Sequence, residues 1–450
     1  MNIYSIPLED KFLLYAPLNG FLALVNQRAA KEVQQSLLDP LSTSEFVKTL
    51  RLSQTIPPQS NTGTLNPIFL GIIPTRSCNA GCRYCDFDPP KQNNPVMGLS
   101  LARDAINDYL LLQKSLGKNQ VEVHFFGGEP FHTEDVVIFS VDYATSRAKE
   151  LGLRIRFEVT TNGVYRPALS KWIAEHLDTV VLSLDGPQDI QDAQRPARNG
   201  KSAFELVFNT AKIISHGSAE LILRACVTKQ TVERMEEIAQ WFAAEFCPAS
   251  VCFETMTPSE LSVKHDLEPP DPWRFAVNFY RASQYLAKHG IEAVHATAET
   301  SVCRTSFCPV GKDALIVSPD GAIDSCYLLQ KNWEEKGLNL RLGQMSAGKI
   351  NVSAESLEHV RSLNVENRPL CAHCLCRYHC AGGCYVNHDT TASPGNFSLL
   401  CVQTRLLAIA NLLKRLGQEA LIEEWMENRE AMEASMWRQS DLLCDQDLTL

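Results

Sequence analysis

The sequence lacks any apolar run of the roughly 20 residues that crossing a bilayer requires. Its start has no basic segment followed by an apolar stretch, so it shows no export signal. It also lacks a basic stripe, and its net charge of −10 argues against a nucleic-acid partner. We therefore expect a cytoplasmic protein that binds neither membranes nor nucleic acids.

The remaining composition is ordinary, with one exception. Apolar residues make up 45% and charged residues 21%, as in a typical globular protein. The 450 residues exceed the size at which one core keeps growing, which predicts two or three domains. The exception is the cysteine count of 16. Without an export signal, so many thiols indicate metal ligation rather than disulfides, because the cytosol keeps thiols reduced.

Three cysteines form the most informative pattern, Cys78-Asn-Ala-Gly-Cys82-Arg-Tyr-Cys85. This loop supplies three thiolates, whereas a cubane iron–sulfur cluster has four irons to ligate. The fourth iron would stay open and able to bind a substrate or cosubstrate. The alternative is a three-cysteine zinc site, although zinc sites favour paired Cys-x2-Cys hooks with a fourth protein ligand.

Short polar motifs follow three of the expected strands, namely Gly127-Gly128-Glu129-Pro130, Thr160-Thr161-Asn162-Gly163 and Ser183-Leu184-Asp185-Gly186-Pro187. Glycines let a backbone approach a ligand closely, and the Glu129 carboxylate can accept hydrogen bonds from an ammonium group. Further along, Arg195 can offer a bidentate guanidinium to a carboxylate.

Together these motifs resemble the signature of the radical S-adenosylmethionine (radical SAM) enzymes. The resemblance implies that Cys78, Cys82 and Cys85 hold a catalytic [4Fe-4S] cluster whose open iron chelates SAM. One electron from that cluster would cleave SAM to a 5′-deoxyadenosyl radical. The resemblance also implies a set of SAM contacts: Tyr84, Gly127, Gly128, Glu129, Pro130, Thr161, Asn162, Ser183, Asp185 and Arg195.

Between Pro67 and about His289, short β-branched or apolar runs alternate with amphipathic helical stretches. The expected strands are Ile68–Pro74, Val121–Phe126, Ile155–Thr160, Thr179–Leu184, Leu221–Val227 and Val251–Thr255, with helices near 99–116, 133–150, 166–177, 202–215, 231–245 and 272–288. Six strand–helix units predict a parallel sheet with catalytic groups at the C-terminal strand ends. This α/β pattern matches the partial (β/α)6, TIM-like barrel of radical SAM enzymes, here over residues 66–300.

Residues 1–65 predict a small α+β module and a linker. Phe12–Tyr15 and Phe21–Val25 read as a hairpin, followed by helices at about 28–38 and Ser44–Leu50 and by a polar linker at Gln54–Leu65. The pattern resembles winged-helix-like modules that bind leader peptides by adding a strand to a sheet edge. The alternative is an extension that only packs on the barrel.

Residues 301–450 carry a second group of cysteines. Its spacing is Cys308-x12-Gly321-x4-Cys326, then Cys371-x2-Cys374-x5-Cys380-x3-Cys384, then Cys401. It resembles the SPASM domain, which houses auxiliary iron–sulfur clusters, although a four-cysteine subset could form a zinc ribbon. The resemblance implies two closed [4Fe-4S] sites, one on Cys303, Cys308, Cys326 and Cys384 and one on Cys371, Cys374, Cys380 and Cys401.

Other features of this region remain expectations. Cys376 could replace a neighbouring ligand of the second site. A hairpin is expected at Ala314–Tyr327, and one or two helices at Leu406–Met432. We expect the acidic end after Ser440 to be frayed.

Enzymes with this architecture mostly oxidise residues in peptides or proteins. We therefore predict an oxidoreductase that modifies a ribosomally made precursor peptide, and we favour thioether or carbon–carbon crosslinking. The N-terminal module would bind the leader, and flavodoxin or ferredoxin would supply electrons. Sulfatase-maturating relatives place an Asp base after the cysteine that corresponds to Cys326, but here that residue is Tyr327, a poor base because its ordinary pKa is near 10. Tyr327 and Glu254 complete the candidate catalytic residues.

Several alternatives stay open. One is a maturase of a protein enzyme, of the formylglycine or quinone-cofactor type, and another is a peptide epimerase. A sugar or small-molecule dehydrogenase would leave the N-terminal module without a purpose. A noncatalytic iron–sulfur or zinc scaffold is opposed by the intact SAM motifs.

Overall fold

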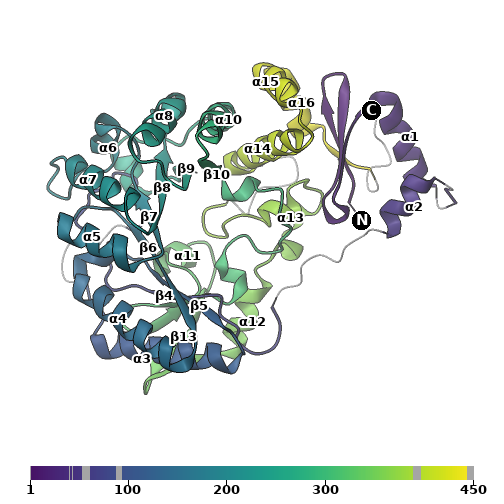
Figure 1. Cartoon of the computed structure of the whole chain (residues 1–450). Helices are drawn as coiled ribbons and strands as arrows, with labels where there is room; N and C mark the ends of the chain where they lie inside the picture. The colour runs from purple at the N-terminus through teal and green to yellow at the C-terminus, as the bar shows by residue number, and fades with distance from the viewer. Residues whose placement is uncertain are drawn as a thin grey trace.

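The computed structural model describes residues 2–39, 41–42, 44–52, 61–87, 94–388 and 397–442. A large sheet with helices around it forms one side of the molecule, and a small N-terminal sheet with two helices forms the other (Figure 1). The last helices of the chain lie between them. None of the helices in these ranges has the length and apolar character that a bilayer crossing requires.

Six strands form the parallel core of the large sheet. They are β4 (Leu70–Ile72), β5 (Gln120–Phe125), β6 (Arg154–Thr161), β7 (Thr179–Ser183), β8 (Glu220–Val227) and β9 (Ser250–Thr255). Each pairs in parallel with the next one in chain order. The fold prediction is confirmed, because all six expected strands are present and their C-terminal ends meet at one edge.

Helices follow these strands as the apolar periodicity predicted. They are α3 (Leu99–Ser115), α4 (Glu134–Leu151), α5 (Pro167–His176), α6 (Gln188–Gln194), α7 (Phe204–Ser215), α8 (Met235–Glu245) and α10 (Pro272–Lys288). The start of α10 shows why: Asp271 accepts hydrogen bonds from the backbone N–H groups of Trp273 and Arg274, and Pro272 occupies the first turn. The short α6 was not predicted.

The sheet continues into the cysteine-rich region. Its further strands are β10 (Glu292–Val294), β11 (Leu315–Val317), β12 (Ala322–Asp324), β13 (Arg341–Ser346) and β14 (Lys349–Val352). The pairing of β11 with β4 is parallel, and the expected hairpin between β11 and β12 is confirmed. One sheet therefore joins the first barrel strand to the auxiliary-cysteine region, and Cys326 follows the end of β12.

The N-terminal module is built from β1 (Tyr4–Leu8), β2 (Lys11–Ala16), β3 (Phe21–Asn26), α1 (Gln27–Leu38) and α2 (Glu45–Leu52). The hairpin and both helices agree with expectation, whereas β1 was not predicted. The expected linker lies largely outside the described residues. The expectation of a frayed end is wrong at its start, because β15 (Ser440–Asp441) pairs antiparallel with β1.

The two faces of the N-terminal sheet have different partners. Tyr4 and Ile6 pack into the main core, whereas Leu14 packs with α1 residues in a separate cluster that also contains Leu442. This alternation follows from the period of two along a strand. Residues 440–442 therefore complete the N-terminal module.

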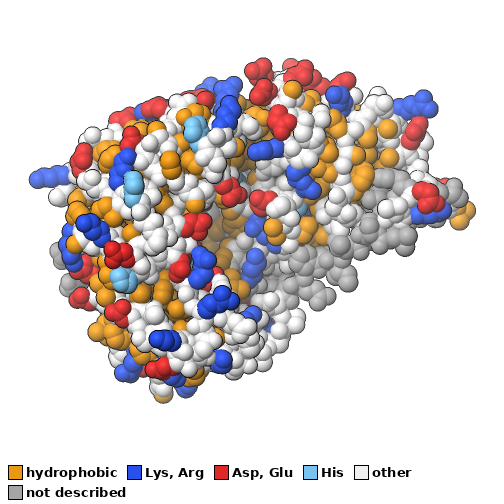
Figure 2. All heavy atoms as spheres, viewed as in Figure 1, with side chains coloured by type: hydrophobic (Ala, Val, Ile, Leu, Met, Phe, Trp, Pro, Cys, Tyr) orange, Lys and Arg blue, Asp and Glu red, His pale blue; other side chains and the backbone are white. Residues whose placement is uncertain are grey.

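Three helices precede that last strand, not one or two. They are α14 (Leu399–Arg415), α15 (Glu419–Glu427) and α16 (Arg429–Trp437). The break before α16 is at Asn428, whose side chain accepts a hydrogen bond from the Ala431 N–H as an N-cap. On the face shown in Figure 2, charged side chains of both signs are interspersed, in line with the absence of a basic stripe.

Candidate active site at the barrel mouth

A cavity of about 420 Å³ opens where the C-terminal ends of the barrel strands meet. Twelve of the residues predicted for catalysis and SAM binding line it: Cys78, Cys82, Tyr84, Cys85, Gly127, Gly128, Thr161, Asn162, Ser183, Asp185, Arg195 and Glu254. The structure thus brings together residues from five separate strand ends, those of β4, β5, β6, β7 and β9. Of the residues predicted for catalysis and SAM binding, Glu129, Pro130 and Tyr327 do not line this cavity.

The two glycines after β5 allow the turn to lie against the start of the cysteine loop. A Cβ atom on Gly128 would meet the backbone oxygens of Ser77 and Arg76 at 2.3 and 2.4 Å, and one on Gly127, where φ is +155°, would meet the Thr75 oxygen at 2.4 Å. The Gly128 N–H donates to the Thr75 carbonyl at 3.1 Å. Only glycine permits this close approach, which fixes the cysteine loop relative to the sheet.

Glu129 lies outside the cavity and holds two of its lining residues in place through hydrogen bonds. Its side chain is 1% exposed and accepts three hydrogen bonds, from the Thr161 hydroxyl at 2.8 Å, the Asn162 N–H at 2.7 Å and the Phe131 N–H at 3.1 Å. Burial raises the pKa of Glu129 to about 7, against the opposing effect of these donors. Pro130 is buried beside it and begins a short 3₁₀ turn. Both residues therefore join β5 to β6 instead of facing the cavity.

Arg195 is held by a network that joins the cysteine loop to β7. Its guanidinium donates to the Tyr84 hydroxyl at 2.7 Å, and that hydroxyl donates to the Asp185 carboxylate at 2.7 Å. The Gln194 amide and the Cys226 N–H complete the donors to Asp185. Burial raises the pKa of Asp185, and the Arg195 charge opposes the shift. Arg195 is thus preorganised at the cavity wall, where it can bind a carboxylate.

The three thiols of the loop are half-buried, and the nearby Arg195 charge acts on those of Cys82 and Cys85. Burial raises the pKa of Cys78 and of Cys85 to about 12, and the neighbouring Glu129 and Cys82 add to the shift at Cys78. A bound metal deprotonates coordinating thiols, so three such thiols on a short loop fit an iron–sulfur cluster. The cavity beside them leaves room for a ligand of that cluster.

Several residues of this cavity were not predicted from the sequence, among them Asp86, Phe87, Phe126, Arg224, Met256, Thr257 and His295. Arg224 of β8 forms an ion pair with Glu254 of β9 at 3.4 Å. The sequence did offer a signal for Arg224, because it lies in the expected strand Leu221–Val227, next to the strand that carries Glu254. His295 could not be found this way, since it follows the unpredicted β10; burial lowers the pKa of this imidazole.

Tyr327 does not reach the cavity. Its ring packs between Phe69 and Phe126. Its buried hydroxyl lies against Gly71, where an added Cβ atom would be only 2.6 Å from the hydroxyl oxygen. Burial raises the pKa of Tyr327 well above its ordinary value. The structure therefore gives no support to a catalytic role for Tyr327, because its position in β-sheet packing, rather than its place in the sequence, determines where the phenol points.

The first auxiliary set is only partly gathered. Burial raises the pKa of Cys308 and Cys326, and the nearby Cys384 thiol contributes to both shifts, so these three lie together. Cys384 also lines the barrel cavity. Cys303 lies differently: its thiol donates to the Pro17 carbonyl at 3.6 Å, beside the N-terminal sheet.

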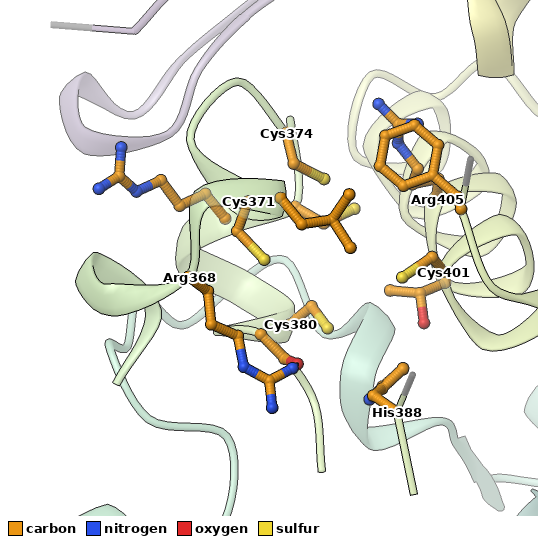
Figure 3. A pocket seen from close by; sticks show the side chains of 13 residues that line it. Arg368, Cys371, Cys374, Cys380, His388, Cys401 and Arg405 are labelled. Carbon is orange, nitrogen blue, oxygen red and sulfur yellow. The ribbon is translucent and has the colours of Figure 1, made fainter. Parts of the chain in front are cut away.

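The second auxiliary set is complete. Figure 3 shows Cys371, Cys374, Cys380 and Cys401 around one cavity, with Arg368 and Arg405 on opposite sides. Burial raises the pKa of Cys380, and the thiols of Cys401, Cys374 and Cys371 add to the shift. Cys376 is buried and lines the same cavity, and a hydrogen bond with it lowers the pKa of Cys374 to about 6. The four thiols fit a cluster.

The family comparison agrees with this geometry. Residues 72–242 match the model of the radical SAM superfamily. The chain therefore contains a radical SAM domain over these residues. In this superfamily a [4Fe-4S] cluster on three cysteines binds SAM, and the loop from Cys78 to Cys85 at the barrel cavity fits that role.

Two curated relatives show how far the similarity extends. The cysteine-type anaerobic sulfatase-maturating enzyme of Clostridium perfringens is 23% identical over 346 residues, covering 72% of this chain and 90% of that protein. An uncharacterised protein of Methanocaldococcus jannaschii is 28% identical over 187 residues, which is 41% of this chain. The chain spans 62% of the length of this second relative.

Two solved structures share the fold. Native anSMEcpe with bound AdoMet and Cp18Cys peptide has a TM-score of 0.61 at 18% identity, covering 78% of this chain and 99% of that one. Streptococcus suis SuiB bound to precursor peptide SuiA has a TM-score of 0.50 at 17% identity, covering 88% and 97%. The radical SAM barrel and the cysteine-rich region thus have the architecture of these proteins.

Proposed function

We propose that this radical SAM enzyme is a maturase that oxidatively crosslinks residues of a ribosomally made precursor peptide. The observation that carries the proposal is the replacement of the expected Asp base by Tyr327, whose hydroxyl is buried away from the cavity. This disfavours the sulfatase-maturation reaction, although the sulfatase-maturating relatives support a peptide or protein substrate. The SuiB structure, with its precursor peptide, has the same overall fold.

The residues of the barrel mouth would have separate roles in binding SAM and in shaping the pocket. When bound, the cluster and SAM supply a 5′-deoxyadenosyl radical that abstracts hydrogen from a C–H bond. Arg195, held by Tyr84, would bind the SAM carboxylate, and Ser183 lies on the same wall. Thr161 and Asn162, fixed by Glu129, would shape the pocket from the β6 side.

We infer that Glu254 accepts a proton from the oxidised residue. Its side chain lines the cavity and is 46% exposed, and its partner Arg224 holds it at 3.4 Å. A carboxylate at the barrel mouth can act as a general base if it comes within hydrogen-bond reach of the proton. We assign that role to Glu254 in place of Tyr327.

The N-terminal module would bind the leader of the precursor. The strand order of its sheet is β15-β1-β2-β3, so the chain's own β15 covers β1 and β3 forms the opposite edge of the described sheet. An extended peptide can add to such an edge through main-chain hydrogen bonds. We infer that the leader pairs along Phe21–Asn26, and that a flavodoxin or ferredoxin serves as electron donor.

The test is an anaerobic incubation of the reconstituted enzyme with SAM, a reductant and the product of the small open reading frame next to its gene. The proposal expects a loss of two hydrogens per crosslink in the peptide mass. A peptide without its leader is the control and should react much more slowly. An unchanged peptide mass with intact SAM cleavage would count against the proposal.

A second candidate is a maturase of a folded or nascent protein enzyme. It is favoured by the 90% coverage of the sulfatase-maturating relative and by the presence of a different carboxylate, Glu254, at the cavity. Incubation with a sulfatase-derived peptide separates the two candidates. Conversion of its cysteine or serine to formylglycine would favour this one.

A further inference from the structure

The second auxiliary site has an unusual set of cations around it. Three arginines, Arg368, Arg377 and Arg405, line the cavity that the four thiols share. Figure 3 shows Arg368 and Arg405 approaching it from two different segments of the chain. Within the described ranges, these are also the only arginines that have a buried N–H group without a hydrogen-bond partner.

Arg368 and Arg405 are held in place mainly by aromatic rings. The Arg368 guanidinium lies 3.6 Å from the centroid of the Tyr385 ring, and that of Arg405 lies 3.9 Å from the Phe397 centroid. Arg368 also donates to the Gly382 carbonyl, which leaves its Nε and Nη2 without acceptors. Arg405 is 4% exposed, and its Nε has no acceptor. Leaving such groups unpaired is costly unless a ligand supplies acceptors.

Their charges are also uncompensated. Neither Arg368 nor Arg405 has a carboxylate ion pair among the residues that the structure describes, whereas Arg377 pairs with Glu366. Four thiolates give a bound cluster a negative charge, and each added electron increases it. Net charge and hydrogen bonds to sulfur are among the factors that set the reduction potential of such a cluster. Two unpaired guanidiniums therefore favour its reduced state.

Among the residues that the structure describes, no equivalent pair lies at the first auxiliary site. The cations that act on its thiols are Arg415, near Cys303, and Lys312, near Cys308. Arg415 already donates to the Thr300 carbonyl at 3.1 Å. The two sites therefore differ in the fixed positive charge that each presents to its cysteines.

We propose that Arg368 and Arg405 raise the reduction potential of a cluster at the second auxiliary site above that of a cluster at the first. An electron that leaves the substrate would then be held at the second site. The proposal rests on the proposed function for the origin of that electron. In this two-electron oxidation, the substrate would give a hydrogen atom to the deoxyadenosyl radical, one proton to Glu254 and one electron to the auxiliary sites. The reduced site then passes its electron to a one-electron acceptor such as an oxidised flavodoxin.

The experiment is a redox titration of the reconstituted full-length protein, followed by electron paramagnetic resonance, without peptide. Arg405→Gln and Arg368→Gln should each lower the midpoint of one auxiliary signal by at least about 59 mV, a tenfold change in the equilibrium of a one-electron couple. Arg377→Gln is the matched control, because its charge is already paired, and should shift that midpoint less. Cys308→Ser assigns the two auxiliary signals.

Lysine variants separate charge from packing. Arg405→Lys keeps the cation and should keep the midpoint near that of the native protein. Loss of iron from the Gln variant but not from the Lys variant would also support a requirement for the cation. Unchanged midpoints in Gln variants with native iron content, or equal effects of Gln and Lys, would overturn the proposal. Because no peptide is present, none of these outcomes depends on which substrate the enzyme modifies.

Discussion

At the barrel mouth the buried carboxylates already have protein donors, whereas at the second auxiliary site the buried guanidiniums lack acceptors. Glu129 and Asp185 each accept three hydrogen bonds from side chains or backbone. Arg368 and Arg405 keep free N–H groups toward a ring of thiols. The barrel is therefore organised before any cofactor binds, and the auxiliary site depends on a cluster to complete its polar contacts.

The largest expected effect tests the chemistry at the organised site. Glu254→Gln should lower product formation at least about 100-fold, because general-base catalysis typically contributes that much. SAM cleavage to 5′-deoxyadenosine should persist, since the ion-pair partner of Glu254 is Arg224 of β8 and not a residue of the cysteine loop. Chromatography of both products in the same reaction measures the ratio. Equal loss of both would show that Glu254 acts in SAM binding instead.

Removal of the clusters should affect the two regions unequally. After anaerobic chelation of iron, amide hydrogen exchange in Cys371–Cys380 and in the first turn of α14 should become at least about tenfold faster, because metal binding there is part of folding. Strands β5 and β6 should exchange as slowly as before. An equal loss of exchange protection in both regions would contradict the claim that only the auxiliary site depends on a cluster for its order.

The glycine turn offers a test of preorganisation in the barrel. Gly128→Ala places a Cβ within 2.4 Å of two backbone oxygens, and such overpacking typically costs about 1–3 kcal/mol. We expect a lower thermal midpoint and less iron on the Cys78 loop. Gly98→Ala is the matched control, because the nearest atom would be 3.9 Å away. Equal behaviour of the two variants would show that the turn is not constrained.

The smallest effect concerns pH. The pKa of Glu129 is raised to about 7 in the folded protein, so between about pH 4.5 and 7 the folded state binds a proton that the unfolded state has lost. Stability should therefore fall as pH rises through this window, by at most about 1.4 kcal/mol per pH unit for one proton. Glu129→Gln should remove this part of the slope in thermal unfolding. A slope unchanged by the substitution would rule out Glu129 as its source.

Much of the barrel could be predicted because its signals are local. Alternating apolar runs place β4 to β9 within about two residues, and the motifs at their ends share an edge as parallel topology requires. The directions in which individual side chains point were not predicted. Spacing does not reveal that Glu129 faces away from the cavity or that Tyr327 packs between phenylalanines, because tertiary contacts decide which way a side chain points.

The cysteine-rich region was predicted through its resemblance to the SPASM domain. That resemblance implied a second set of four thiols, and the four line one cavity. No sequence pattern marks Arg368 or Arg405 as their neighbours, since these approach from segments flanking the cysteine run. Likewise, nothing local predicts that Ser440–Asp441 pairs with β1, a contact across almost the whole chain. Long-range pairings of this kind leave little trace in a single sequence.

The central claim is that Cys78, Cys82 and Cys85 hold a cluster with one iron open to SAM. Its most direct test is electron paramagnetic resonance of the reduced, anaerobically reconstituted protein before and after addition of SAM. The account predicts that SAM changes the signal of one cluster and that Cys82→Ala abolishes both that signal and the change. A spectrum indifferent to SAM, or zinc bound to this loop in fresh preparations, would contradict it.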